Sequence, residues 1–237
     1  MGKLKIVNGE VRDVTFSGKL SSKIVIPQGV TRIDNLAFWN CRRLKSVEIP
    51  ESVKSIGETA FQGCKKLQSV KIPSNVKSID SEVFQYCESL KSVELPPNLQ
   101  SIKSNSFENC SSLTSIELPE SITSIGVHAF FGCSRLASVK IPEAVSKISG
   151  GAFGGCDSLT SVEIPQAVTS IGEYAFVGCK ALTSVFIPIG VKSIGKKAFF
   201  ACNANLTIYC EAESQPTDWN KEWKNKETPV VWGYKNQ

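Results

Sequence analysis

Nine cysteines and one histidine are the side chains of this chain that could act as nucleophiles or bind a metal ion. Eight of the cysteines recur every 23 residues, and the ninth, Cys210, falls in register with Ile49. If each 23-residue unit forms one coil, equivalent thiols lie about 4.8 Å apart with parallel Cβ directions, which suits neither a disulfide nor a tetrahedral metal site. We therefore predict buried, reduced thiols that fill the core, without metal or cofactor. The periodic set is Cys41, Cys64, Cys87, Cys110, Cys133, Cys156, Cys179 and Cys202.

The single histidine, His128, would have to serve any Ser–His–Asp or Cys–His catalytic arrangement. In other units its position is occupied by Thr59, Glu82, Tyr174 and Lys197, which are variable and mostly polar. This pattern indicates a surface position. The sequence also lacks the phosphate-loop, serine-hydrolase and zinc-protease motifs, so we predict that the protein is not an enzyme.

One copy of the repeat, Pro50–Ile72, reads PESVKSIGETAFQGCKKLQSVKI. Apolar and polar residues alternate in Leu44–Ile49, as in a β-strand, and Pro50 ends this strand because it cannot donate to a ladder. A second extended piece follows at Val53–Ile56. The inward set of a coil is predicted to be Leu44, Val47, Ile49, Val53, Ile56, Ala60, Phe61 and Cys64.

The rest of each unit returns the chain to the next strand. Gly57 marks a turn in which a positive φ is allowed but not required, because Lys103 and Ser149 hold the same position in other units. Ala60–Cys64 is predicted to form a tight helical or 3-10 turn. Units of this kind bury their apolar faces only by stacking, so we predict one elongated domain.

Three parts are predicted along the chain. Residues 1–26 form a capping hairpin and a partial repeat, with strands Leu4–Val7 and Val11–Phe16 around an Asn-Gly turn. Residues 27–210 form an array of eight 23-residue units. Residues 211–237 form a Trp-rich cap over the last coil, with a short capped helix at Pro216–Trp223 and an extended stretch at Pro229–Trp232.

The repeated pattern A-F-x-x-C-x-x-L-x-S-V-x-I-P-x-x-V-x-S-I-G, seen from Ala60 and again from Ala175, resembles the BspA-like leucine-rich repeats of bacterial surface proteins. The resemblance covers about residues 24–210. It implies a curved, mostly β solenoid with parallel strands and short helical or 3-10 turns, classed with the α/β horseshoes. It also implies a non-catalytic role in protein binding or adhesion, at the cell surface or secreted. The asparagine that follows the strand in general leucine-rich repeats is mostly absent, since Ser52, Ala144 and Gly190 stand at that position.

Charge is unevenly distributed. Residues 1–77 carry a net charge of +8, whereas residues 78–237 carry −3. The excess predicts a basic patch that binds an anionic glycan such as heparin, or a solvated surface with a local lysine excess. Aromatic residues do not alternate with these cations, so no nucleic acid is expected. The patch comprises Arg42, Arg43, Lys45, Lys65 and Lys66.

The beginning of the sequence, Met1–Lys5, is too polar for a secretion signal, and no run of about 18 apolar residues predicts membrane insertion.

Rows of outward residues are the predicted contact surfaces. A uniform serine row lies beside a variable, mostly charged row, for which alternating Glu and Lys could simply pair across strands. A third row, at the turn, includes Trp39, Phe131 and Phe200. We predict a module that presents the charged row to a protein, such as a host extracellular-matrix protein, or to a glycan; the alternative is a structural spacer or display segment without a specific ligand. The charged row is Glu48, Lys71, Glu94, Glu117, Lys140, Glu163 and Phe186.

Overall fold

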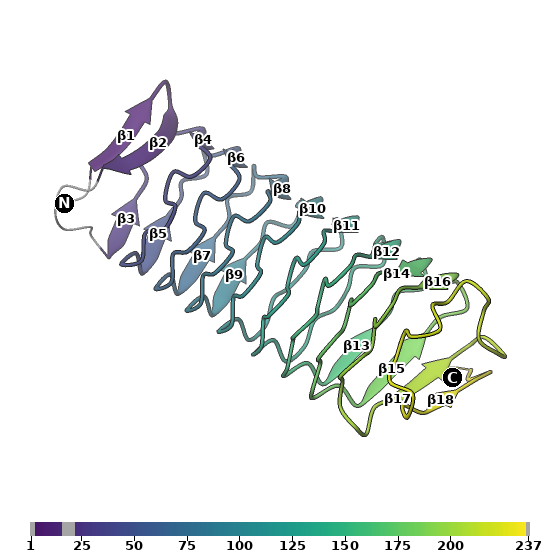
Figure 1. The fold of residues 1–237 in the computed structure, drawn as a ribbon. Helices are drawn as coiled ribbons and strands as arrows, with labels where there is room; N and C mark the ends of the chain where they lie inside the picture. Colours follow the sequence, from purple (N-terminus) through teal and green to yellow (C-terminus); the bar gives the residue numbers. More distant parts are fainter. Residues whose placement is uncertain (1–2, 16–21, 236–237) are drawn as a thin grey trace.

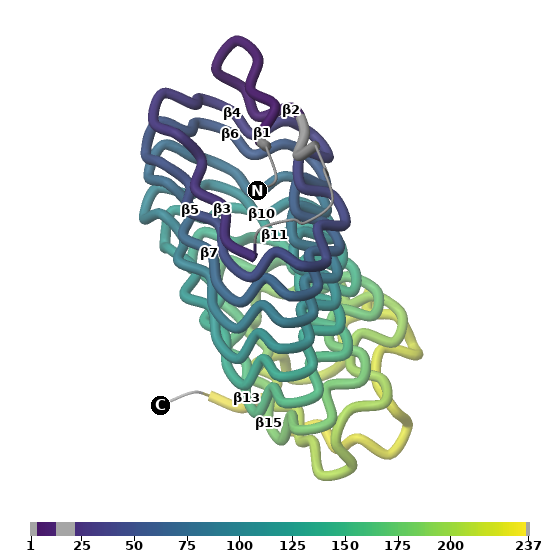
Figure 2. Tube along the Cα trace, turned by 90° about the vertical axis from the view of Figure 1, so that its left-hand side faces the viewer, coloured from purple at the N-terminus to yellow at the C-terminus, as the bar shows by residue number. Residues whose placement is uncertain are grey.

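The computed structural model describes residues 3–15 and 22–235 and shows a single β-solenoid whose coils stack along one long axis (Figure 1). Figure 2, which looks obliquely along the stack, shows the coils following one another with similar outlines. Met1–Gly2 and the predicted strand end at Phe16 lie outside the described residues.

Each coil carries two strand positions, and both form parallel ladders. The first position forms the strand face, which consists of β3 (Lys23–Val25), β5 (Ser46–Glu48), β7 (Ser69–Lys71), β9 (Ser92–Glu94), β13 (Ser161–Glu163), β15 (Ser184–Ile187), β17 (Thr207–Cys210) and β18 (Val230–Val231). The second position consists of β4 (Arg32–Ile33), β6 (Ser55–Ile56), β8 (Ser78–Ile79), β10 (Ser101–Ile102), β11 (Ser124–Ile125), β12 (Lys147–Ile148), β14 (Ser170–Ile171) and β16 (Ser193–Ile194).

Residues that pair in these ladders are one repeat apart in the sequence. Ser69 pairs with Ser92, and Ser101 pairs with Ser124, so residues 23 apart lie above one another. On the strand face, the ladder across the two coils between β9 and β13 is reduced to isolated bridges, Ser115 with Ser138 and Lys140 with Glu163. Backbone hydrogen bonds also connect these coils, such as that from the Ala137 N–H to Thr114 at 3.1 Å. The predicted solenoid is therefore confirmed.

The predicted helical turn at Ala60–Cys64 is wrong, because no helix occurs within residues 3–15 and 22–235. The N–H groups of Phe61 and Gly63 donate to Val83 and Gln85 of the next coil, at 3.0 and 2.8 Å. The intervening N–H of Gln62 donates back to Thr59 at 3.0 Å. Since alternate donors serve the neighbouring coil, the segment forms successive turns and cannot close the internal hydrogen bonds of a helix.

Positive φ occurs two residues beyond the predicted glycine position. Thr59 has φ 57°, and the equivalent residue of every coil from Leu36 to Lys197 also has a positive φ. Gly57 itself does not; a Cβ there would lie 2.6 Å from the backbone N of Asn35 in the preceding coil. Glycine at that position therefore permits close approach of two coils.

Replacing Thr59 with glycine should stabilise the protein. A β-branched residue is strained at positive φ, so Thr59→Gly should raise the free energy of unfolding by about 0.5–1 kcal/mol, measured by urea denaturation. Thr114→Gly is the matched control, because Thr114 is exposed and has no positive φ. This control should lower stability, and a loss of stability in Thr59→Gly would contradict the assignment of strain.

A phenylalanine column fills the core beneath the turns. The rings are fully buried, nearly parallel and 4.8–5.6 Å apart between neighbouring coils. This spacing is close to the strand spacing of about 4.8 Å, so the rings follow the strand ladders from coil to coil. The predicted inward residues are buried, except that Ile49 is partly buried. The column is Phe38, Phe61, Phe84, Phe107, Phe130, Phe153, Phe176 and Phe199.

Both ends of the stack are covered. β1 (Lys3–Val7) and β2 (Glu10–Thr15) form the predicted hairpin, with positive φ at Asn8 and Gly9, and β2 pairs in parallel with β4. At the other end the predicted helix at residues 216–223 is wrong, because this stretch forms turns, whereas Val230–Val231 is extended as β18. Trp223 packs edge-on against Phe199, with ring centroids 5.9 Å apart. Within the described part of the chain, no helix has the length and apolar character to cross a membrane.

Candidate binding surfaces

The charged row of the strand face is exposed from Glu48 to Glu163. Alternation along each strand causes this, since the central residue of each Ser-x-x triplet is buried and its two neighbours point outward. The serine row beside it is half-exposed at Ser46 and exposed from Ser69 to Ser184. Phe186, at the end of the charged row, is half-buried against Tyr234, with ring centroids 6.0 Å apart. The open part of the row is therefore charged.

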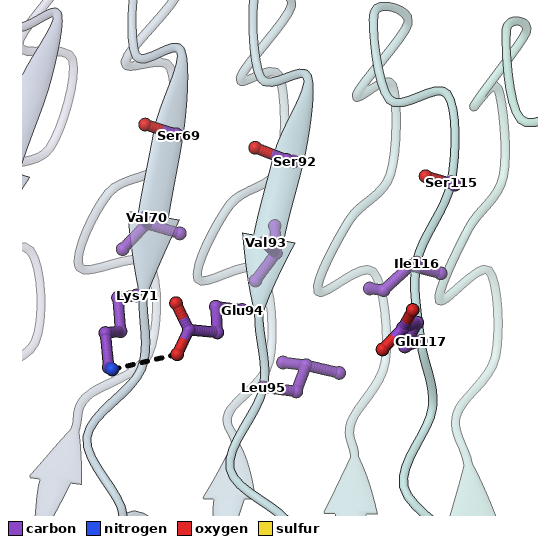
Figure 3. A pocket seen from close by; sticks show the side chains of 10 residues that line it. All are labelled: Ser69, Val70, Lys71, Ser92, Val93, Glu94, Leu95, Ser115, Ile116 and Glu117. Carbon is purple, nitrogen blue, oxygen red and sulfur yellow. Dashed lines mark ion pairs between the residues drawn. The ribbon is translucent and has the colours of Figure 1, made fainter.

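A shallow groove of about 470 Å³ lies on this face across β7, β9 and the next coil. Figure 3 shows Lys71 and Glu94 facing each other across two strands, with Glu117 beyond them. The Lys71 Nζ lies 2.8 Å from a Glu94 carboxylate oxygen, and this hydrogen bond raises the pKa of the Lys71 ammonium. The buried Val70, Val93 and Ile116 form the floor.

Cross-strand pairing explains only part of the charged row. Lys71 pairs with Glu94, but Lys140 pairs with Glu120, 2.7 Å away on the preceding coil, and this contact lowers the pKa of Glu120. Glu117 and Glu163 form no ion pair with any residue of the described chain. Two exposed carboxylates thus remain available on this face.

The predicted basic patch is a set of exposed side chains on neighbouring coils: Arg42, Arg43, Lys45, Lys65 and Lys66. Lys65 pairs with Glu88 at 2.6 Å, and the Arg42 Nε donates to Asn40 at 2.8 Å. The charge of Lys65 is therefore partly neutralised, whereas the other four cations have no ion-pair partner among the described residues. Glycan binding there stays a prediction.

The third predicted row, at the turns, contains a hydrogen-bonded chain that the sequence did not indicate. The Trp39 indole donates to Gln62 at 2.8 Å, Gln62 donates to Gln85, and Gln85 donates to Glu108 at 2.5 Å. The sequence feature that could have predicted this chain is the recurrence of glutamine one residue after the buried phenylalanine. Further along, Phe131 lies over Gly154, where an added Cβ would meet its ring at 2.8 Å. Of the aromatic residues predicted for this row, Trp39 and Phe200 are exposed and Phe131 is half-buried.

The cysteine column has a structural role. Each thiol from Cys64 to Cys202 donates to the carbonyl of a core phenylalanine in the preceding coil, at Sγ–O distances of 3.1–3.4 Å. Those seven and Cys210 are free thiols, and only Cys202 among them is partly exposed. Burial of the other periodic cysteines, and of Cys210, is confirmed. Cysteine here fills space and supplies a weak donor to a buried carbonyl.

His128 is half-buried, and its ring packs against Phe131 with centroids 5.1 Å apart. Residues 3–15 and 22–235 contain no group of three or more His, Cys, Asp or Glu side chains that could hold a metal ion.

Comparison with known proteins is consistent with this geometry. The family model of the BspA type leucine-rich repeat region, with six copies, matches residues 9–134 and 100–215. The chain belongs to the BspA-type leucine-rich repeat family. The repeat fold of this family is generally non-catalytic. The search of curated proteins found no match.

Solved structures similar to this BspA-type protein are bacterial leucine-rich repeat proteins. One from Bacteroides ovatus is 27% identical with a TM-score of 0.79, covering 98% of this chain and 65% of that one. One from T. pallidum is 27% identical with a TM-score of 0.66, covering 86% and 87%. One from Eubacterium ventriosum is 28% identical with a TM-score of 0.66, covering 74% and 47%. The chain thus spans about two thirds of the first protein and about half of the third.

Proposed function

We propose that this chain is a non-catalytic binding module of a bacterial surface or secreted protein, and that its strand face binds a partner protein. The observation that carries the proposal is the pair of exposed carboxylates, Glu117 and Glu163, which have no ion-pair partner among the described residues. Charges that are already paired across strands gain little from a partner, whereas unpaired charges can complement an approaching surface.

The partner is a protein with a basic contact surface. Glu48 is paired with Lys23 and Glu94 with Lys71, so the unpaired charges of the exposed row are the carboxylates of Glu117 and Glu163, among the residues that the structure describes. The short, uniform serine side chains beside this row allow close approach of a partner. Host extracellular-matrix proteins are the class to test, because the family is one of bacterial repeat proteins.

The test is binding to immobilised fibronectin, fibrinogen, laminin and collagen, followed by surface plasmon resonance. Glu117→Lys combined with Glu163→Lys should weaken capture by about tenfold or more, since like charges would then face a basic partner. The matched control is Glu58→Lys combined with Glu173→Lys, which reverses two exposed carboxylates at one repeat position away from the strand face. No capture by the parent chain would favour the spacer alternative, and equal capture by both double variants would show that the strand face is not the binding surface.

A further inference from the structure

A cavity of about 570 Å³ opens between the last coil and the C-terminal segment, the yellow end of the chain in Figure 1. We propose that this cavity is a binding site for a sulfated glycan, whose sulfate esters are held by lysine ammonium groups. This site is separate from the strand face and does not depend on the proposed function. The cationic residues that line it are Lys196, Lys197, Lys221, Lys224 and Lys226.

The cavity carries a large excess of positive charge. Glu222 is the carboxylate in its lining, and it pairs with Lys196 at 3.0 Å. Lys197, Lys221, Lys224 and Lys226 form no ion pair with residues 3–15 or 22–235. Four ammonium groups around one hollow repel one another, and a bound polyanion removes that repulsion.

Local contacts hold two of the lysines in place. The Lys197 Nζ lies 5.0 Å from the centre of the Phe200 ring, and the Lys224 Nζ lies 5.8 Å from that of Trp223. Cation–π contacts of this kind orient an ammonium group without neutralising its charge. Lys224 also donates to the backbone carbonyl of Asn225 at 3.2 Å. Part of the site is therefore ordered before a ligand arrives, which reduces the entropic cost of binding.

The aromatic rings of the cavity favour a glycan over a nucleic acid. Single-stranded nucleic acids bind by stacking successive bases on exposed rings. Trp223 is 1% exposed, and Phe200 has Lys197 over one face. The cavity thus offers ammonium groups with little surface for stacking.

The cations in the lining are of a kind that can hold sulfate esters. Lysine acts as a compact point charge with three rotatable donors, so it pairs with a tetrahedral anion without the fixed geometry that the planar fork of arginine requires. All cationic side chains in the lining are lysines.

Net charge along the sequence concealed this site. Residues 78–237 carry −3 overall, so charge counting placed anion binding at the other end of the molecule. The N–H of Lys197 donates to Glu222 and that of Phe199 donates to Trp223, both at 2.8 Å, so the C-terminal segment continues the stack as a further coil. These bonds bring together two groups of lysines that are more than twenty residues apart in the sequence.

The experiment is calorimetric titration of the full chain with a heparin-derived oligosaccharide at low ionic strength. Lys221→Gln combined with Lys226→Gln should weaken binding about tenfold, because both side chains are exposed and make no contact that the fold needs. Arg43→Gln combined with Lys66→Gln makes the same change in net charge within the N-terminal basic patch and should leave affinity within about twofold. Unchanged melting temperatures would show that both variants are folded, and Lys197→Gln provides a second test inside the cavity.

Several outcomes would overturn the proposal. These are no binding by the parent chain, unchanged affinity in the cavity variants, or an equal or larger loss in the N-terminal control. Displacement of the oligosaccharide by an equal concentration of single-stranded DNA or polyphosphate would show a general polyanion site and would also reject it. The strand-face variant Glu117→Lys with Glu163→Lys should retain heparin binding, so failure of one proposal is distinguishable from failure of the other.

Discussion

Raising the pH to about 10 should unfold this protein, although lysine and arginine side chains remain mostly charged there. The cause is the buried thiol column. Burial raises the pKa of Cys133 and Cys210 to about 12 and that of Cys202 to about 11. Burial also raises the pKa of Cys87, Cys110, Cys156 and Cys179, and a hydrogen bond with Cys41 together with burial raises that of Cys64.

The direction follows from proton linkage. Above pH about 8.5 the unfolded chain releases thiol protons that the folded chain retains, so the free energy of unfolding falls as the pH rises. The stability that these thiols contribute is fully present below that pH. It is lost as the pH rises from there towards the pKa values of the thiols in the folded protein. Well above that pH each thiol contributes a slope of about 1.4 kcal/mol per pH unit, so eight thiols lower the free energy of unfolding by roughly 10 kcal/mol for each further pH unit. That loss is comparable to the whole stability of an ordinary domain, about 5–15 kcal/mol.

Urea denaturation at a series of pH values from 7 to about 10.5, with a reducing agent present, measures this slope. Cys110→Ser, Cys133→Ser and Cys156→Ser remove three titrating groups while a hydroxyl retains a donor for the phenylalanine carbonyls. The triple variant should lose about 4 kcal/mol per pH unit of alkaline sensitivity, although its stability at pH 7 is lower. Equal slopes in the parent and the triple variant would show that the thiols ionise freely in the folded state.

The sequence predicted the stacking register because the residues that repeat are ones that fit only a few positions in a core. A phenylalanine and a cysteine every 23 residues fit a buried column only if each coil lies directly on the one before it. The pairing of Ser69 with Ser92 and the parallel rings of Phe107 and Phe130 both follow from that condition. The register can therefore be predicted without predicting the turns or any helix.

The turns could not be predicted from local sequence because their hydrogen bonds lie between coils. Ala60–Cys64 and Pro216–Trp223 both suggested helices, yet Phe61 N–H donates to the next coil, and Trp223 O accepts from Phe199 of the coil before it. A local pattern contains the donors of a segment but not the neighbouring acceptors. The positive φ at Thr59 was missed for the same reason, since it turns alternate N–H groups toward the adjacent coil.

The sequence predicted which residues form the outward rows, but not which side chains in those rows contact one another. Alternation along the strands was enough to place Glu94 and Glu117 outward. Which carboxylate a lysine selects depends on side-chain reach, and Lys140 pairs with Glu120 although Glu163 is its backbone neighbour. The lysine-lined cavity depends on the path of the C-terminal segment after Cys210, where the repeat no longer constrains the chain.

Phe130→Ala should lower the free energy of unfolding by about 3–5 kcal/mol. Phe130 is fully buried and stacks on Phe107 at 5.4 Å and on Phe153 at 5.5 Å, so its removal leaves a cavity shared by two coil interfaces. Because the stability of a solenoid is approximately a sum over neighbouring coils, the loss should exceed that of Phe38→Ala, since Phe38 stacks on Phe61 alone among residues 3–15 and 22–235.

The adjacent residue provides the control. Phe131 has the same side chain but is half-buried at the surface, where its ring contacts His128, so Phe131→Ala should cost about 1 kcal/mol or less. Urea denaturation followed by tryptophan fluorescence and by circular dichroism measures all three variants, since Trp223 reports on the last phenylalanine of the column. Similar losses for Phe130→Ala and Phe131→Ala would mean that the buried column does not hold the coils together, and the ranking of Phe130 above Phe38 tests whether coupling is limited to adjacent coils.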